Sequence, residues 1–329
     1  MATRAEPERA AAPERRPELD AVRMLVVLGL IFFHSALVFA SDDDYYVKND
    51  ETTGAIMILA GFAVVWAMPA LFPISGLGAW YSLRRRGGAG FTRGRLLRLG
   101  VPLVFVTLAL NPLPQWLRLR SASSSYDQSY AAFLPDFYDV RIEPAEFPFL
   151  VQGEHFETGH LWFVVLLLAF SLMLVPVARL LPAVPVGRVA GAVERRSGLI
   201  LLPALGLAVL CAFAGLEEDY AGWHRWAYAV FFAAGCALAA EDRFRVVTRR
   251  DADVAWWLGG GLFALAGAGF ATAEEPFTEM TPLGIALRAC FGAAGWCLVL
   301  AILGTLDARR LRRPEPAAGF RPWTDTIIP

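Results

Sequence analysis

Two residues in the first apolar stretch of this 329-residue chain are of types that could do chemistry. The stretch is LDAVRMLVVLGLIFFHSA, residues 19–36, with Arg23 near one end and His34 near the other. A histidine titrates near neutral pH and can act as a general base. Ionisable groups in a membrane span are costly and usually face a protein interior or a wet cavity. His34 is therefore either a catalytic base or a hydrogen-bonded packing residue.

The spacing places both residues on one face of a helix. Eleven residues correspond to three turns plus about 20°, with a rise of ~16 Å. Arg23 and His34 therefore cannot touch, and they mark two positions along one path. Asp20 falls on nearly the same stripe and can pair with Arg23 at i,i+3. Arg23 alone would equally serve as an interfacial anchor.

The elements that must position these residues are membrane-spanning helices. The chain is 56% hydrophobic and 19% charged, which is typical of a polytopic membrane protein. The net charge of −1 favours neither a nucleic acid nor an acidic substrate. We predict an all-α bundle, because eight stretches approach the length that a span needs: residues 23–40, 55–82, 99–117, 160–181, 198–215, 226–241, 254–272 and 283–306.

The distribution of charge predicts an orientation. Most of the 30 basic residues lie in the two tails and in segments 84–98, 179–197 and 241–253, on alternate sides of the predicted spans. The positive-inside rule then places both termini in the cytoplasm. We predict cytoplasmic tails at 1–18 and 307–329, a transmembrane domain at 19–306 and an outer loop at 118–159. The many Ala, Gly and Arg residues suggest a GC-rich bacterial genome, and hence a multi-pass protein of the plasma membrane.

Metal and cofactor chemistry has little support in the sequence. The four cysteines lie in apolar stretches and form no CxxC or Cys/His cluster. His155 is flanked by acids but lacks further converging ligands. The glycine-rich GGGLFALAGAGF follows no strand, so we interpret it as close helix packing rather than a nucleotide loop. We expect no metal and no bound cofactor.

Four segments in order resemble one family. They are LDAVRMLVVLGLIFFH with its Arg-x10-His pattern, MPALFPISGLGAWYSLRRR with Ser75-Gly76, FTRGRLLRLGVPLVF with Arg95 and Arg98, and GHLWFVVLLLAFSL with His160 and Trp162. Together they resemble the membrane-bound acyltransferase 3 family, and within it the glucan-biosynthesis protein C group. The resemblance covers roughly residues 17–181, and beyond that only the hydropathy is similar.

The resemblance implies transfer of an acyl group from cytoplasmic acyl-CoA, either acetyl-CoA or succinyl-CoA. The acceptor would be a hydroxyl of an extracytoplasmic glucan or another glycan, and His34 would take its proton. The donor phosphates would bind a set of cytoplasmic arginines, namely Arg23, Arg93, Arg95 and Arg98. Plain positive-inside topology would also explain Arg93, Arg95 and Arg98.

Supporting roles remain open for the other matched residues. Ser75 and Gly76 either expose backbone groups to a cavity at a break in the second span or form a simple kink. His160 and Trp162 contact the acceptor or the catalytic centre, although a tryptophan at that depth can be an interfacial anchor. Direct transfer is preferred over an acyl-enzyme, because neither Ser35 nor Ser75 has a base at a defined spacing.

Two other functions remain open. The family generally has about ten spans, whereas this chain ends after the eighth predicted span, so it could be a truncated, non-catalytic member. Intramembrane charge would also suit a transporter, but no inverted repeat is visible. The partners expected are acyl-CoA, a hydroxyl acceptor and the lipid bilayer, without nucleic acid. The oligomeric state cannot be read from the sequence.

Overall fold

The computed structural model describes residues 17–41, 49–122, 125–180, 186–272 and 277–312, which are mostly helical. A small antiparallel sheet pairs β1 (Val140–Ile142) with β2 (Val151–Gly153), placing Arg141 opposite Gln152. The longer helices are α1 (Pro17–Leu37), α2 (Ala55–Arg95), α4 (Pro112–Ala122), α5 (Tyr130–Phe137), α6 (Trp162–Leu180), α7 (Val186–Arg195), α8 (Pro203–Ala214), α9 (Arg225–Ala240), α10 (Asp242–Arg250), α11 (Ala252–Phe270) and α12 (Pro282–Arg312).

Short helical segments connect these helices. They are η1 (Leu96–Gly100), α3 (Val101–Phe105), η2 (Val106–Leu110), η3 (Pro144–Glu146), η4 (Gly159–Leu161), η5 (Leu199–Leu201) and η6 (Glu218–Tyr220). Every one of the eight predicted spans contains a helix. Among the described residues, four stretches are long and apolar enough to cross a membrane: Leu19–Leu37, Leu59–Ser121, Gly159–Leu180 and Pro282–Arg312. The structure therefore supports a helical membrane protein, while the number of eight spans stays a prediction.

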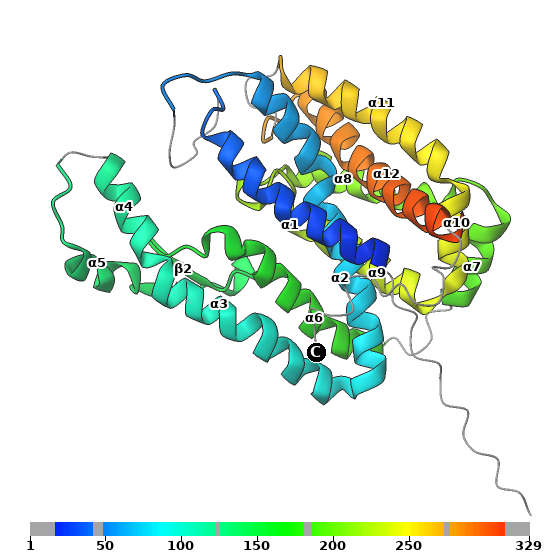
Figure 1. The fold of residues 1–329 in the computed structure, drawn as a ribbon, viewed down its shortest axis with the longest axis horizontal. Helices are drawn as coiled ribbons and strands as arrows, with labels where there is room; N and C mark the ends of the chain where they lie inside the picture. Colours follow the sequence, from blue (N-terminus) through cyan, green and yellow to red (C-terminus); the bar gives the residue numbers. More distant parts are fainter. Residues whose placement is uncertain (1–16, 42–48, 123–124, 181–185, 273–276, 313–329) are drawn as a thin grey trace, which may run out of the picture.

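The second and third predicted spans form one long element that bends at Gly87. Gly87 has φ 69° and ψ 171°, a conformation that glycine adopts without a Cβ clash. Two π-helical segments, η1 and η2, follow the bend. Pro102, the second residue of α3, lacks the N–H that an ordinary helical turn would direct back to a carbonyl of η1, which accounts for the local widening. The chain thus turns back, and α6 packs against both α2 and η1 (Figure 1).

The two ends of the bundle carry different elements. The sheet and α5 lie at the left in Figure 1, whereas α7 and α10 lie at the right. Leu19 of α1 lines a cavity together with Leu303 and Asp307 of α12. Both ends of the described chain therefore lie at the end of the bundle that carries α10.

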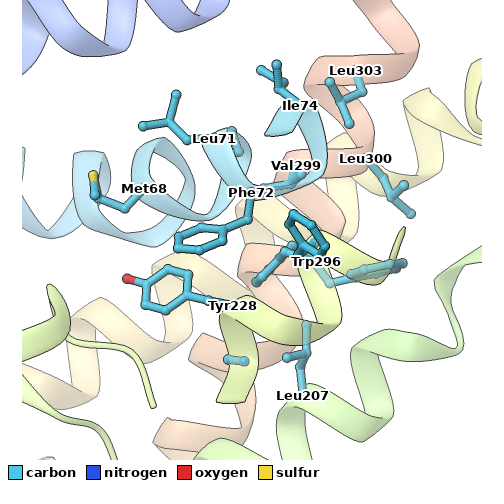
Figure 2. Close-up of a cluster of buried hydrophobic side chains, with 14 of the residues drawn as sticks. Met68, Leu71, Phe72, Ile74, Leu207, Tyr228, Trp296, Val299, Leu300 and Leu303 are labelled. Carbon is cyan, nitrogen blue, oxygen red and sulfur yellow. The ribbon is translucent and has the colours of Figure 1, made fainter. Parts of the chain in front are cut away.

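Helix α12 is the buried centre of the fold. It packs against α2, α8 and α11, and the ring of its Trp296 lies 5.7 Å from that of Phe231 of α9. Beside it, Phe72 of α2 stacks on Tyr228 of α9 at 4.4 Å between ring centroids (Figure 2). Three glycines of α12 let neighbouring backbones approach. A Cβ on Gly292 would lie 2.6 Å from the Leu207 carbonyl oxygen of α8. One on Gly295 would lie 2.9 Å from the Val65 oxygen of α2, and one on Gly304 2.4 Å from the Thr248 oxygen of α10.

Candidate active site

The histidine of the first helix meets a second histidine. His34 lies in the last turn of α1 and His160 in η4, which leads directly into α6. Their ring centroids are 4.5 Å apart, with 44° between the ring planes. A neutral imidazole can accept a proton from a hydroxyl, which is the chemistry that a general base requires.

Loop contacts hold η4 in place beside α1. Gly159 has φ 52°, which glycine tolerates. The Asn111 side chain donates to the Glu157 carbonyl at 3.1 Å, which ties this loop to the turn after η2. Trp162 is buried, and its ring lies 5.3 Å from that of Tyr228 and 5.9 Å from that of Tyr220. Trp162 therefore anchors the start of α6 among the aromatic rings of the core.

Arginines gather at the other end of α1. Arg23 is exposed and forms the expected pair with Asp20 at 3.6 Å. Arg95 interacts electrostatically with Arg23, Arg86 and Arg98, and it lies 5.1 Å from the centroid of the Phe91 ring. Like charges repel unless an anion lies among them. The structure thus brings together three of the four predicted donor-binding arginines and adds Arg86.

Arg86 was absent from the predicted set because its position depends on the bend at Gly87. The bend brings its guanidinium close to Gly94, where a Cβ would lie 3.2 Å from Nη1. In the sequence, Arg86 is simply the last of three consecutive arginines. No periodicity in that run indicates which of the three exposed arginines lies near Gly94.

Arg93 lies apart from the other predicted arginines. Two helical residues rotate by about 200°, so Arg93 and Arg95 point to opposite faces. Arg93 instead lines a groove shared with Arg179 of α6. Arg179 was not among the predicted site residues, because the only signal was its place in a basic segment.

Ser75 and Gly76 belong to a regular part of α2. The non-helical residue inside α2 is Gly87, so the backbone continues as a helix through both positions. A Cβ on Gly76 would lie 2.1 Å from the Phe232 carbonyl oxygen of α9. The Cys236 thiol donates to the Gly76 carbonyl at 3.3 Å. The glycine is therefore explained by close packing of α2 on α9, and Ser75 is half-buried beside it.

A salt-bridge cluster closes the end of the bundle nearest the histidine pair. Arg225, the first residue of α9, pairs with Glu217 at 2.8 Å and with Glu146 at 3.0 Å. Its guanidinium also lies over the rings of Phe149 and Tyr220, at 5.7 and 5.2 Å. The cluster fastens the segment around η3 to the connection between α8 and α9. Sequence reasoning missed it because Glu146 lies 79 residues from Arg225.

Tyr220 links this cluster to η4. Its ring stacks on Phe149 at 4.7 Å, and its carbonyl accepts a hydrogen bond from the Tyr228 hydroxyl at 2.7 Å. Burial raises the pKa of the Tyr220 hydroxyl to about 12, although the Arg225 charge opposes the shift. Because Tyr220 also contacts Trp162, packing is continuous from the Arg225 cluster to the residue that follows η4.

A second polar cluster lies between α7 and α11, around Asp251. This carboxylate is 2% exposed. It accepts hydrogen bonds from Gly198 N at 2.9 Å, Ser197 Oγ at 3.0 Å and Arg250 Nε at 2.8 Å. Burial by itself would raise the pKa of Asp251, but these bonds outweigh it and lower the pKa. The cluster fixes the connection that follows α7.

Metal coordination has no visible support in the described part of the chain, where no three His, Cys, Asp or Glu residues come close enough to hold an ion. None of the cysteines in that part of the chain forms a disulfide bond.

The fold and these contacts describe a helical membrane protein with an imidazole pair and an arginine cluster. A family model described as an acyltransferase domain, Acyl_transf_3, matches residues 16–313. The chain therefore belongs to the acyltransferase 3 family, as the four segments predicted. The match also extends through α12, well beyond the region of resemblance. No curated protein and no solved structure matches the chain significantly.

Proposed function

We propose that this chain is an integral-membrane O-acyltransferase with His34 as its general base. The observation that carries the proposal is the contact of His34 with His160, with their ring centroids 4.5 Å apart. Membership of an acyltransferase family supports the reaction class. The arginine cluster near the opposite end of α1 supports binding of a phosphorylated donor.

Acyl-CoA is the donor that fits this arrangement. Arginine forks bind phosphate through two parallel hydrogen bonds, which suits Arg23, Arg95 and Arg98. The ~16 Å rise from Arg23 to His34 is comparable to an extended pantetheine arm. The thioester could then reach the imidazole while the nucleotide stays beside the arginines. Arg93 was predicted in the same set, but its separate position in the groove suggests another role.

The proposed step is direct transfer. The acceptor hydroxyl attacks the thioester carbonyl while His34 takes the hydroxyl proton. A C–O bond forms, the C–S bond breaks, and the CoA thiolate leaves and takes up the proton from His34. His160, with its ring centroid 4.5 Å from that of His34, lies close enough to contact the same bound acceptor.

The membrane arrangement extends the same proposal. We propose eight spans within residues 19–306, with cytoplasmic tails at 1–18 and 307–329 and an outer loop at 118–159. The donor would then bind from the cytoplasm of a bacterial cell, and the acceptor would come from outside the plasma membrane. The resemblance to the glucan-biosynthesis protein C group supports a glucan or another glycan as acceptor, and acetyl or succinyl as the acyl group.

The test supplies radiolabelled acetyl-CoA or succinyl-CoA and a host envelope extract to membranes that contain the full chain. We expect label in an alkali-labile product, and a rate at least about 100-fold lower in His34→Ala. Ser35→Ala is the matched control, because its hydroxyl donates to the Ile31 carbonyl of its own helix at 2.8 Å.

Two results would contradict the proposal. Full activity in His34→Ala would show that His34 is not the general base. No transfer from either donor by a folded wild-type chain would favour a non-catalytic member of the family.

A further inference from the structure

The groove between the end of α2 and the end of α6 has no part in the proposed reaction. It is lined by Gly88, Ala89, Thr92, Arg93, Leu96, Leu97, Val175 and Arg179. The bend at Gly87 creates it, because the chain folds back there against α6. Gly88 forms its floor, where a Cβ would lie 2.7 Å from Nη2 of Arg179. The missing side chain therefore lets the Arg179 guanidinium lie across the groove.

Two cations and an apolar wall share this groove. Within the described part of the chain, neither Arg93 nor Arg179 forms an ion pair with a carboxylate. Leu96 and Leu97 are 44% and 56% exposed, and the neighbouring Leu180 is 78% exposed. Exposed leucines of this kind belong in hydrocarbon when the protein lies in a bilayer. The groove thus joins a positively charged edge to a surface that faces lipid.

The position of the groove argues against the donor as its occupant. Arg95, on the opposite face of the same helix turn, interacts with Arg23, whereas Arg93 faces away from that cluster. A donor that reaches His34 along α1 would lie on the Arg95 side. An occupant of the groove needs a negative headgroup for the arginines and an acyl chain for the leucines.

We propose that this groove binds an anionic phospholipid. Arg93 and Arg179 hold the headgroup phosphate, and Thr92 belongs to the same lining. The acyl chains follow Leu96, Leu97 and Val175 into the bilayer. Basic pockets between membrane helices are a known means of recognising acidic lipid headgroups. The lipid would fasten the α2 bend to α6.

The test measures lipid binding to the purified full chain in detergent, without any acyl transfer. The probes are phosphatidylglycerol and phosphatidylcholine with the same acyl chains, each titrated by native mass spectrometry. We expect the wild type to prefer phosphatidylglycerol. Each arginine near a charged headgroup contributes about fivefold in affinity, so Arg93→Gln with Arg179→Gln should weaken phosphatidylglycerol binding by about 25-fold.

The matched control is Arg188→Gln with Arg195→Gln, two exposed arginines of α7 outside the groove. This variant carries the same change in charge and should keep the wild-type preference. Arg93→Lys with Arg179→Lys should keep most of the affinity. That result would show that the glutamine variant loses affinity because it lacks the two charges and not because it misfolds. Leu97→Asn should weaken phosphatidylglycerol while leaving any binding of inorganic phosphate unchanged.

Three results would overturn the proposal. One is equal binding of the two lipids by the wild type, and another is an unchanged preference in the Arg93/Arg179 glutamine variant. The third is displacement of phosphatidylglycerol by CoA, which would assign the groove to the donor instead. Because no result depends on catalysis, a failure of the proposed acyltransferase activity would leave this test intact.

Discussion

Substitution of Gly76 by alanine should separate α2 from α9. The added Cβ would lie 2.1 Å from the Phe232 carbonyl oxygen and 3.0 Å from its carbon, and real Cβ atoms essentially never come closer than 3.0 Å. The obstacle is backbone, so no side-chain rotation relieves it. The helices must move apart by about 1 Å, and overpacking of this kind typically costs 1–3 kcal/mol.

The matched control lies two residues further along the same helix. Gly78→Ala meets nothing within 4 Å, so it should gain up to about 1 kcal/mol from helix propensity. The two variants should therefore differ by roughly 3 kcal/mol in the free energy of unfolding. Reversible unfolding in mixed detergent micelles, followed by tryptophan fluorescence, measures that difference.

A second glycine in the same interface sharpens the test. A Cβ on Gly235 would lie 2.0 Å from the Pro73 carbonyl oxygen, so Gly235→Ala demands the same separation of α2 and α9. Because one movement relieves both clashes, the double variant should lose less than the sum of the single losses. If Gly76→Ala is as stable as Gly78→Ala, the close approach of these helices does not exist in solution.

Two further perturbations address the polar clusters. Arg225→Met leaves Glu217 and Glu146 without their shared cation. Because the Arg225 side chain is only 18% exposed, we expect a loss of about 2–3 kcal/mol in unfolding free energy. Arg225→Lys should restore part of it, and full stability of the methionine variant would exclude a stabilising role for these ion pairs. The pKa of Asp251 is lowered in the folded protein, so its stabilising contribution is present above the unfolded value of ~3.9 and disappears as the pH falls through the folded value. Unfolding midpoints measured between pH 7 and pH 3 should therefore fall less steeply in Asp251→Asn than in the wild type, and parallel curves would contradict the assigned network.

The helices could be predicted because their signals are local. Long apolar runs and charged segments alternate along the chain, and each predicted span contains a helix. The relation of Asp20 to Arg23 follows from helical spacing alone, and the structure confirms the pair. The lengths of α8 and α9 show the limit of this reasoning, since composition does not tell a short membrane helix from a buried one.

The site depended on long-range contacts that spacing does not encode. His34 and His160 are 126 residues apart, and only the family resemblance suggested that they belong together. Arg93 and Arg95 are neighbours in sequence, yet helix geometry sends them to different surfaces. The bend that brings Arg86 to Arg95 depends on the positive φ angle of Gly87, and no sequence pattern around Gly87 predicts that angle.

Gly292, Gly295 and Gly304 of α12 also determine where each neighbouring helix lies along the bundle. Each accepts the backbone of a different helix, through Leu207 of α8, Val65 of α2 and Thr248 of α10. A slide of one residue along α12 would bring a side chain against each of these carbonyls. These contacts therefore fix the positions of α2, α8 and α10 along the axis of α12. Since α2 in turn packs against α1 and α6, the level at which the two histidines meet is set from a helix that carries neither of them.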